Sequence, residues 1–250
     1  MTPTEEDFQR GWDTLLAKAQ KAPPDAPFGW VEEDILRLME GLDLMPGGTV
    51  VPPGIYRQKG NRFRDVIRVL LQRKSGLEFH ERRIAGLTDQ HVVDLAYPYK
   101  GDPKLTIEVK MAGRPRHVDE SGIERPIRGG EVDFDKRLKE VKYTPVDLKL
   151  RYTGLHGQNW DDWIGDSIPR FYSIWAFMIG QGTRTEATVE KFRRLAEHYN
   201  NDVGIFLYEE GKGHYRRVES SAALSLSVDA VLNRISADAR TLGLTPPDDP

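Results

Sequence analysis

Two acidic residues and one lysine lie close together in residues 90–111, in a pattern that suits metal-assisted hydrolysis. Asp94 follows a short apolar run, and Glu108 and Lys110 alternate with apolar residues in the next run. Carboxylate oxygens are ligands that Mg²⁺ prefers, and the carbonyl of Val109 can supply a third oxygen. A lysine beside such a cation can orient the attacking water and offset charge on a phosphate. The expected chemistry is hydrolysis of a phosphodiester.

Two neighbouring strands must position these three side chains. Apolar, β-branched runs at residues 91–97 and 104–111 flank a turn-rich stretch at 98–103, which predicts two strands joined by a loop. Side chains two residues apart share one face of a strand, so Glu108 and Lys110 are expected on the same face. The alternative is a β-hairpin whose exposed face carries alternating charges.

The remaining periodicity predicts an α/β protein. In chain order, the pattern predicts a helix at residues 61–74, a strand at 77–85, a buried strand at 170–179, a helix at 186–199 and a buried strand at 202–208. The last three elements form a compact strand–helix–strand unit, which indicates a parallel pair with a crossover helix.

The segments outside this pattern divide the chain into three expected parts. Residues 1–50 are expected to form an N-terminal helical region with helices at 5–21 and 31–42. Residues 51–215 are expected to form the core, and a loop at 48–60 connects the two parts. Residues 216–250 hold a final helix at 222–242 and a disordered tail. An insertion at about 112–168 interrupts the core. Within it we expect a loop at 112–130, a short helix at 132–141, a strand at 146–152 and an irregular stretch at 154–166.

The strand–turn–strand arrangement around Asp94 and Glu108-Val109-Lys110 resembles the PD-(D/E)XK nuclease superfamily, which includes many type II restriction endonucleases. In that family an acid after a hydrophobic stretch is followed, one strand later, by Glu-X-Lys or Asp-X-Lys. Val93 stands where the family's motif often has proline. The resemblance covers roughly half of the chain. It implies a mixed central β-sheet flanked by helices, with a core in the order helix-β-β-β-helix-β.

The resemblance also implies a function. It points to a Mg²⁺-dependent endonuclease, with Mn²⁺ as a substitute, that cuts double-stranded DNA as a homodimer so that two sites cut two strands. Asp94, Glu108 and the carbonyl of Val109 would hold the metal, Lys110 would position the water, and Asp65 is the candidate for an additional acid. Two alternatives stay open, namely a nuclease-like module that binds nucleic acid without cutting and an RNA-specific or structure-specific nuclease.

Similar triplets occur elsewhere in the chain. Residues 140–142 also read Glu-X-Lys, so the triplet alone carries little weight. Residues 147–149, Asp-Leu-Lys, form a rival site with Asp133 or Asp135 as the upstream acid. Both of these upstream acids fall at an expected helix start, where the helix dipole favours them for structural reasons.

Composition narrows the class of protein. The 250 residues include no cysteine, which excludes disulfides and thiolate metal sites, and the six histidines show no zinc-ligand spacing. No apolar run is long enough to cross a membrane, and the polar start is unlike a signal peptide. These features fit a cytoplasmic protein with no membrane contact.

Basic residues are concentrated in parts of the chain despite a net charge of −3. Residues 57–83 carry nine Lys and Arg against three acidic residues, a local charge of +6. Such a segment is compatible with a polyanion-binding face and equally with a solvated helix face. The residues predicted to contact nucleic acid are Arg62, Arg64, Arg68, Arg114, Arg116, Arg125, Arg128 and Lys149.

Overall fold

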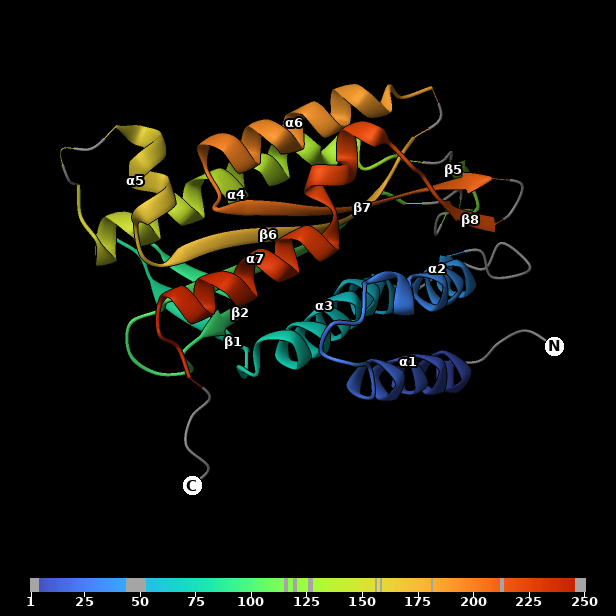
Figure 1. Cartoon of the computed structure of the whole chain (residues 1–250). Coiled ribbons are helices and arrows are strands. Elements are labelled where there is room, and N and C mark those ends of the chain that lie inside the picture. Colours follow the sequence, from blue (N-terminus) through green and yellow to red (C-terminus); the bar gives the residue numbers. More distant parts are fainter. Residues whose placement is uncertain are drawn as a thin grey trace.

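The computed structural model describes residues 5–43, 53–114, 117–118, 121–125, 128–155, 157, 159–180, 182–211 and 214–245. A six-stranded mixed sheet lies at the centre, with helices on both faces (Figure 1). The strand order is β1-β2-β3-β6-β7-β8, and the bounds are β1 His80–Ala85, β2 Gln90–Tyr97, β3 Leu105–Ala112, β6 Arg170–Met178, β7 Asp202–Gly211 and β8 His214–Arg217. The predicted α/β class with a mixed, helix-flanked sheet is confirmed.

Strand direction changes across the sheet. β1, β2 and β3 pair antiparallel, β3, β6 and β7 pair parallel, and β8 returns antiparallel to β7. β6 is the central parallel strand and is buried along nearly its whole length, which explains its continuous apolar sequence. Its partner β7 follows after one crossover helix, so the predicted parallel strand–helix–strand unit is confirmed.

Two hydrophobic clusters separate the helices into layers. One face of the sheet packs against α1 Glu5–Gln20, α2 Gly29–Asp43, α3 Pro53–Ser75 and α7 Val228–Thr241. The other face packs against α4 Glu131–Tyr152, α6 Thr185–His198 and the 3₁₀ helix η1 Ser221–Leu226. The helix α5 Trp160–Asp166 packs beside α6. No helix among the described residues is long and apolar enough to cross a membrane.

The longest segment whose secondary structure was predicted wrongly lies in α4. Residues 146–152 were predicted as a strand, but they form the last turns of this helix, which continues through Pro145. Val146, Leu148 and Leu150 alternate over a short window, whereas the buried residues Phe134, Leu138, Val141 and Leu148 make a helical stripe over the whole segment. Tertiary packing of that stripe outweighs the local pattern and the proline.

Smaller differences concern element ends and short pieces. α3 begins at Pro53, inside the predicted 48–60 loop. The predicted loop at 112–130 contains the two-residue strands β4 His117–Val118 and β5 Glu124–Arg125, and the irregular stretch at 154–166 contains α5. The predicted final helix is divided at Ser227, whose side chain caps α7 by accepting the N–H of Ala230. β8 was not predicted. The tail predicted to be disordered begins at Thr245, which is described and whose carbonyl accepts a hydrogen bond from Tyr97, while residues 246–250 lie outside the described residues.

Candidate metal centre

The antiparallel ladder between β2 and β3 ends at the candidate site. It comprises the pairs Leu95↔Ile107, Ala96↔Thr106 and Tyr97↔Leu105. From Val93 back to Gln90, β2 pairs with β1 alone, and from Glu108 to Ala112, β3 pairs with β6 alone. Asp94 and Glu108 are therefore the first residues past the last shared pair. Backbone groups of β3 that face β2 are available to side chains there.

A β-bulge in β2 sets the direction of Asp94. The β1–β2 register runs from His80↔Ala96 to Arg82↔Val93, so β2 uses one residue more than β1 across this step. Consequently Val93 and Ala96 face the same hydrophobic cluster although they are three positions apart. Bulges re-aim side chains and are frequent next to active sites. Here the carboxylate Oδ2 of Asp94 accepts the backbone N–H of Val109 at 2.9 Å.

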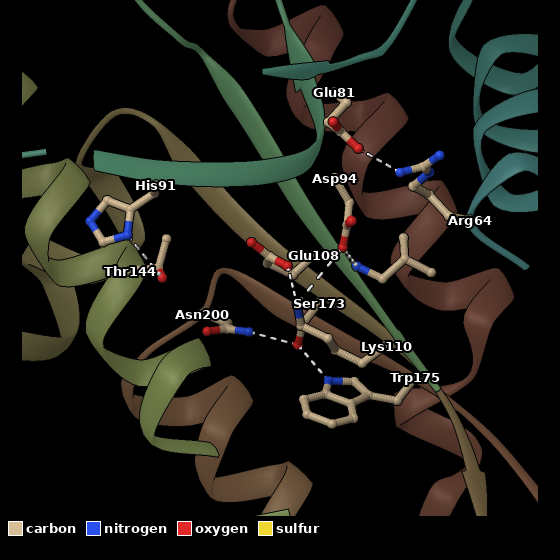
Figure 2. A network of polar contacts seen from close by, with 11 residues as sticks. Arg64, Glu81, His91, Asp94, Glu108, Lys110, Thr144, Ser173, Trp175 and Asn200 are labelled. Atoms are coloured by element: carbon tan, nitrogen blue, oxygen red, sulfur yellow. Dashed lines mark hydrogen bonds and ion pairs between the residues drawn. The ribbon is translucent and has the colours of Figure 1, made fainter. Parts of the chain in front are cut away.

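Lys110 lies between the two carboxylates. Its Nζ is 2.5 Å from Glu108 Oε2 and 3.9 Å from Asp94 Oδ2. Figure 2 shows the three side chains converging from the two strands. Glu108 and Lys110 come from the same strand face, as the alternation in the sequence predicted, and together with Asp94 they make a cluster with a formal charge of −1.

Burial shapes the electrostatics of this cluster. The side chain of Glu108 is only 7% exposed, and burial raises its pKa to about 8 even though Lys110 acts in the opposite direction. For Lys110, burial works against the ammonium, but the carboxylates of Glu108 and Asp94 outweigh it and hold its pKa above the ordinary value. The ammonium of Lys110 is therefore held firmly in its charged form.

The cluster borders a pocket of about 640 Å³ that opens between α3 and α4. Its acidic lining residue is Asp94. Its cationic lining residues are Lys59, Arg64, Lys110, Arg114, Arg128 and Arg137. Such an excess of positive charge around one carboxylate favours a polyanionic ligand over a neutral or cationic one.

Arg114 and Arg128 line the pocket, and their paired backbones form the base of the hairpin that holds β4 and β5. Their backbones form an isolated antiparallel bridge, with N–H···O distances of 2.7 and 2.8 Å in the two directions. Residues directly opposite each other in such a pair project to the same face. The base is held against β6, because Gly113 has φ of 108° and a Cβ there would lie 2.3 Å from the Cβ of Met178. The two guanidinium groups are thus carried by a tightly packed support.

The basic residues predicted on α3 have different surroundings. Arg64 lines the pocket and also contacts Glu81 Oε2 at 2.7 Å. Asp65 lies 3.6 Å from Arg64 and 3.5 Å from Arg68, and it does not line the pocket. Its carboxylate is therefore engaged by arginines, and no contact with Asp94 or Glu108 is described.

Among the described residues, the others predicted to contact nucleic acid do not line the pocket. Arg62 donates a hydrogen bond to Gln9, on α1. Arg125 is exposed on β5, and Arg116 lies outside the described residues. Lys149 is fully buried, and its Nζ donates to the carbonyls of Ile164 and Ser167 at 2.8 Å each, and to Asn201 Oδ1 at 3.0 Å. The prediction that Lys149 contacts nucleic acid is wrong, because this amine has no access to solvent.

The rival Asp-Leu-Lys triplet is a structural feature of α4. Asp147 accepts hydrogen bonds from the backbone N–H of Thr88 at 2.9 Å and of Asp89 at 3.2 Å, and it contacts His91 Nε2 at 2.7 Å. Its carboxylate thereby fixes the β1–β2 turn. Asp133 and Asp135 belong to the first turns of the same helix, and the side-chain surroundings of Asp133 lie outside the described residues. The rival prediction is wrong because a helix directs Asp147 and Lys149 to different neighbours.

Two pocket residues were not singled out from the sequence. Lys59 is buried on α3, four positions before Phe63, so extending the apolar stripe of that helix backwards would have placed it inward. Arg137 is on α4, and nothing in its local sequence distinguishes it from the neighbouring exposed cations. Only the packing of α4 beside β3 brings it to the pocket.

The residues present fit a hard divalent cation with few protein ligands. Among the described residues there is no group of three or more His, Asp or Glu side chains that could hold a metal. The N–H of Val109 points to Asp94, and in a strand the C=O of a residue points to the same side as its N–H. The carbonyl of Val109 therefore faces the gap beyond the ladder. Two carboxylates and one carbonyl suit Mg²⁺, which usually keeps several waters.

Comparisons with protein-family models, curated proteins and solved structures find no match to this chain.

Proposed function

We propose that the protein is a Mg²⁺-dependent endonuclease that hydrolyses phosphodiester bonds of double-stranded DNA, in the manner of type II restriction enzymes. The observation that carries this proposal is the convergence of Asp94, Glu108 and Lys110 where the β2–β3 ladder ends, at the border of a cationic pocket. If the short elements β4, β5 and α5 are set aside, the order α3-β1-β2-β3-α4-β6 also agrees with the helix-β-β-β-helix-β core of the superfamily that the sequence resembles.

Each residue has a role in this proposal. Asp94, Glu108 and the carbonyl of Val109 would hold the cation, which would polarise the phosphoryl oxygen and acidify water. Lys110 orients the attacking water with its ammonium. The water oxygen bonds to phosphorus as the bond from phosphorus to the leaving oxygen breaks; the attacking water gives up one proton to solvent, and the leaving oxygen takes one up from solvent. Arg64, Arg114, Arg128 and Arg137 bind the phosphates and stabilise the charge that develops in the transition state.

A cleavage assay with Lys110→Ala tests the assignment. With Mg²⁺ and plasmid DNA, the wild-type protein should give discrete fragments and Lys110→Ala should give none, because the attacking water loses its orienting group. Binding of both proteins to duplex DNA in Ca²⁺ should be nearly equal. Lys100→Ala, an exposed lysine in the β2–β3 loop, is the control and should cut normally. Full activity of Lys110→Ala would contradict the assignment.

A second candidate is a module that binds nucleic acid without cutting it. The position of Asp65 favours this candidate, since its pairing with Arg64 and Arg68 leaves two carboxylates at the centre. The same assay separates the two, because a module without catalysis binds DNA but yields no fragments from the wild-type chain at any Mg²⁺ concentration. Homodimerisation belongs to the endonuclease proposal, and sedimentation of the protein with and without a DNA duplex tests it.

A further inference from the structure

A small polar residue, Ser173, is buried in the middle of β6, the most apolar strand of the sheet. β6 reads RFYSIWAFM, and Ser173 in its centre is 0% exposed. A hydroxyl buried in such surroundings costs free energy unless its hydrogen bonds are made. Alanine or valine would pack there without that cost, so the hydroxyl calls for an explanation in terms of its neighbours.

The register of β3 and β6 places Ser173 beside the candidate metal centre. In this parallel pair Glu108 is opposite Ser173 and Lys110 is opposite Trp175. Trp175 belongs to the cluster on the α4 and α6 side of the sheet, and residues two apart in a strand share a face. Ser173 and Glu108 are therefore direct neighbours on the same face, about 5 Å apart at their backbones.

The hydroxyl of Ser173 accepts two hydrogen bonds, which leaves its O–H to act only as a donor. Its Oγ accepts from Trp175 Nε1 at 3.0 Å and from Asn200 Nδ2 at 2.8 Å (Figure 2). A hydroxyl has two lone pairs and one O–H, so both acceptor positions are filled and only the donor remains. The ionisable neighbour that β6 places beside this donor is Glu108.

Asn200 supports the same arrangement. It is 2% exposed, and its Oδ1 makes no hydrogen bond with the described residues, while its Nδ2 is directed at Ser173. Asn200 therefore uses its amide group to orient Ser173.

We propose that Ser173 is a positioning residue for the metal centre, which donates its O–H to the carboxylate of Glu108 when a divalent cation is bound. In the structure described here Lys110 holds Glu108 Oε2. The hydrogen bonds from Trp175 and Asn200 fix the orientation of the Ser173 hydroxyl. Its O–H is then directed at the Glu108 carboxylate and holds that carboxylate in the orientation that ligates the cation. This inference rests on the proposed metal-dependent function.

Mn²⁺ binding by the full-length protein tests this role, with the free-ion signal in electron paramagnetic resonance as the readout. Ser173→Ala should raise the Mn²⁺ dissociation constant at least about 10-fold, as loss of a partner that orients a ligand usually does. Asn200→Asp should have the same effect, because the new carboxylate accepts the hydroxyl proton. Ser236→Ala is the matched control, since Ser236 is a 3% exposed serine whose Oγ donates to the carbonyl of Lys74, and its helix α7 covers the sheet face opposite to that of Ser173.

The outcomes separate the inference from the proposed function. Unchanged Mn²⁺ affinity in folded Ser173→Ala overturns the inference, whether or not the wild-type protein cuts DNA. Weakened Mn²⁺ binding in a protein that never cuts DNA supports the inference and overturns the nuclease proposal. No Mn²⁺ binding by the wild type overturns both. If Ser173→Ala does not fold, Trp175→Phe releases one lone pair of Ser173 while keeping an aromatic ring, and an unchanged Mn²⁺ affinity in that variant overturns the inference.

Discussion

At the scale of single residues, the acid-X-lysine triplet directs its side chains differently in a strand and in a helix. On β3 the triplet puts Glu108 and Lys110 on one face, and their side chains meet at 2.5 Å. On α4 residues two apart point about 200° apart around the helix axis. Asp147 therefore bonds the β1–β2 turn, while Lys149 reaches the carbonyls of α5. Burial, with Arg170 nearby, lowers the pKa of Lys149 to about 7, opposite to the shift of Lys110.

The buried amine of Lys149 should be essential for stability. Lys149→Met keeps an unbranched side chain, one heavy atom shorter, but removes the three hydrogen bonds of the buried amine, so the free energy of unfolding should fall by about 3 kcal/mol. Urea denaturation followed by circular dichroism measures the change. The control is Lys139→Met, an exposed lysine on the same helix, with an expected change within about 0.5 kcal/mol. Equal stability of the two variants would contradict this role.

At the scale of elements, α4 is joined to the β1–β2 turn by one carboxylate. Hydrogen bonds from Thr88, Asp89 and His91 outweigh burial and lower the pKa of Asp147 below the ordinary value. A carboxylate with a lowered pKa stabilises the fold at neutral pH, and that stabilisation is lost as the pH falls through its folded-state pKa.

The pH dependence of unfolding should reveal this contact. Asp147→Asn should be less stable than the wild type at pH 7. The difference should begin to shrink below roughly pH 4, the ordinary pKa at which the unfolded carboxylate takes up its proton, and should be lost as the pH falls through the lowered folded-state pKa. Urea denaturation at several pH values between 3 and 7 measures it. A difference that stays constant over this range would show that the ionised form of Asp147 contributes nothing.

The same contact forbids a side chain at position 86. A Cβ on Gly86 would lie 1.9 Å from Asp147 Oδ2, so Gly86→Ala must displace the carboxylate from the turn. We expect a loss of about 1–3 kcal/mol in unfolding free energy. Gly165→Ala, in α5, meets nothing within 4 Å and should be neutral or slightly stabilising because alanine favours a helix. Thermal melts of the two variants provide the comparison.

At the scale of the whole molecule, a chain with a net charge of −3 gathers six cations around one pocket. If the four arginines among them bind phosphates, DNA affinity should fall steeply with salt, because each neutralised phosphate releases counterions. Arg137→Gln should weaken binding to every duplex and reduce the slope of log affinity against log salt by about 1. Lys136→Gln, an exposed neighbour on α4, should leave the slope unchanged. Fluorescence anisotropy in Ca²⁺ measures both.

The sequence predicted the sheet and the candidate cluster better than it predicted their surroundings. Strand patterns placed Asp94 on one strand and Glu108 and Lys110 on the next, because the alternation is a local property. The bulge that turns Asp94 toward Val109 depends on register with β1, which a single strand does not encode by itself. Similarly, Arg137 and Ser173 reach the centre through packing between segments that are distant in the chain.

The parallel pairing of β3 with β6 has a consequence for how the protein is made. A ribosome that has completed β3 has already produced Asp94, Glu108 and Lys110, yet α4 and α5 must still be synthesised before β6 exists to lie beside them. At about 5–20 residues per second, the half-made chain spends several seconds without Ser173 or Arg137 in place. Pairings between such distant segments also form slowly. For the nuclease proposed above, we expect the nascent protein to remain inactive until β6 is added, so that an unfinished copy released early would leave nucleic acid intact.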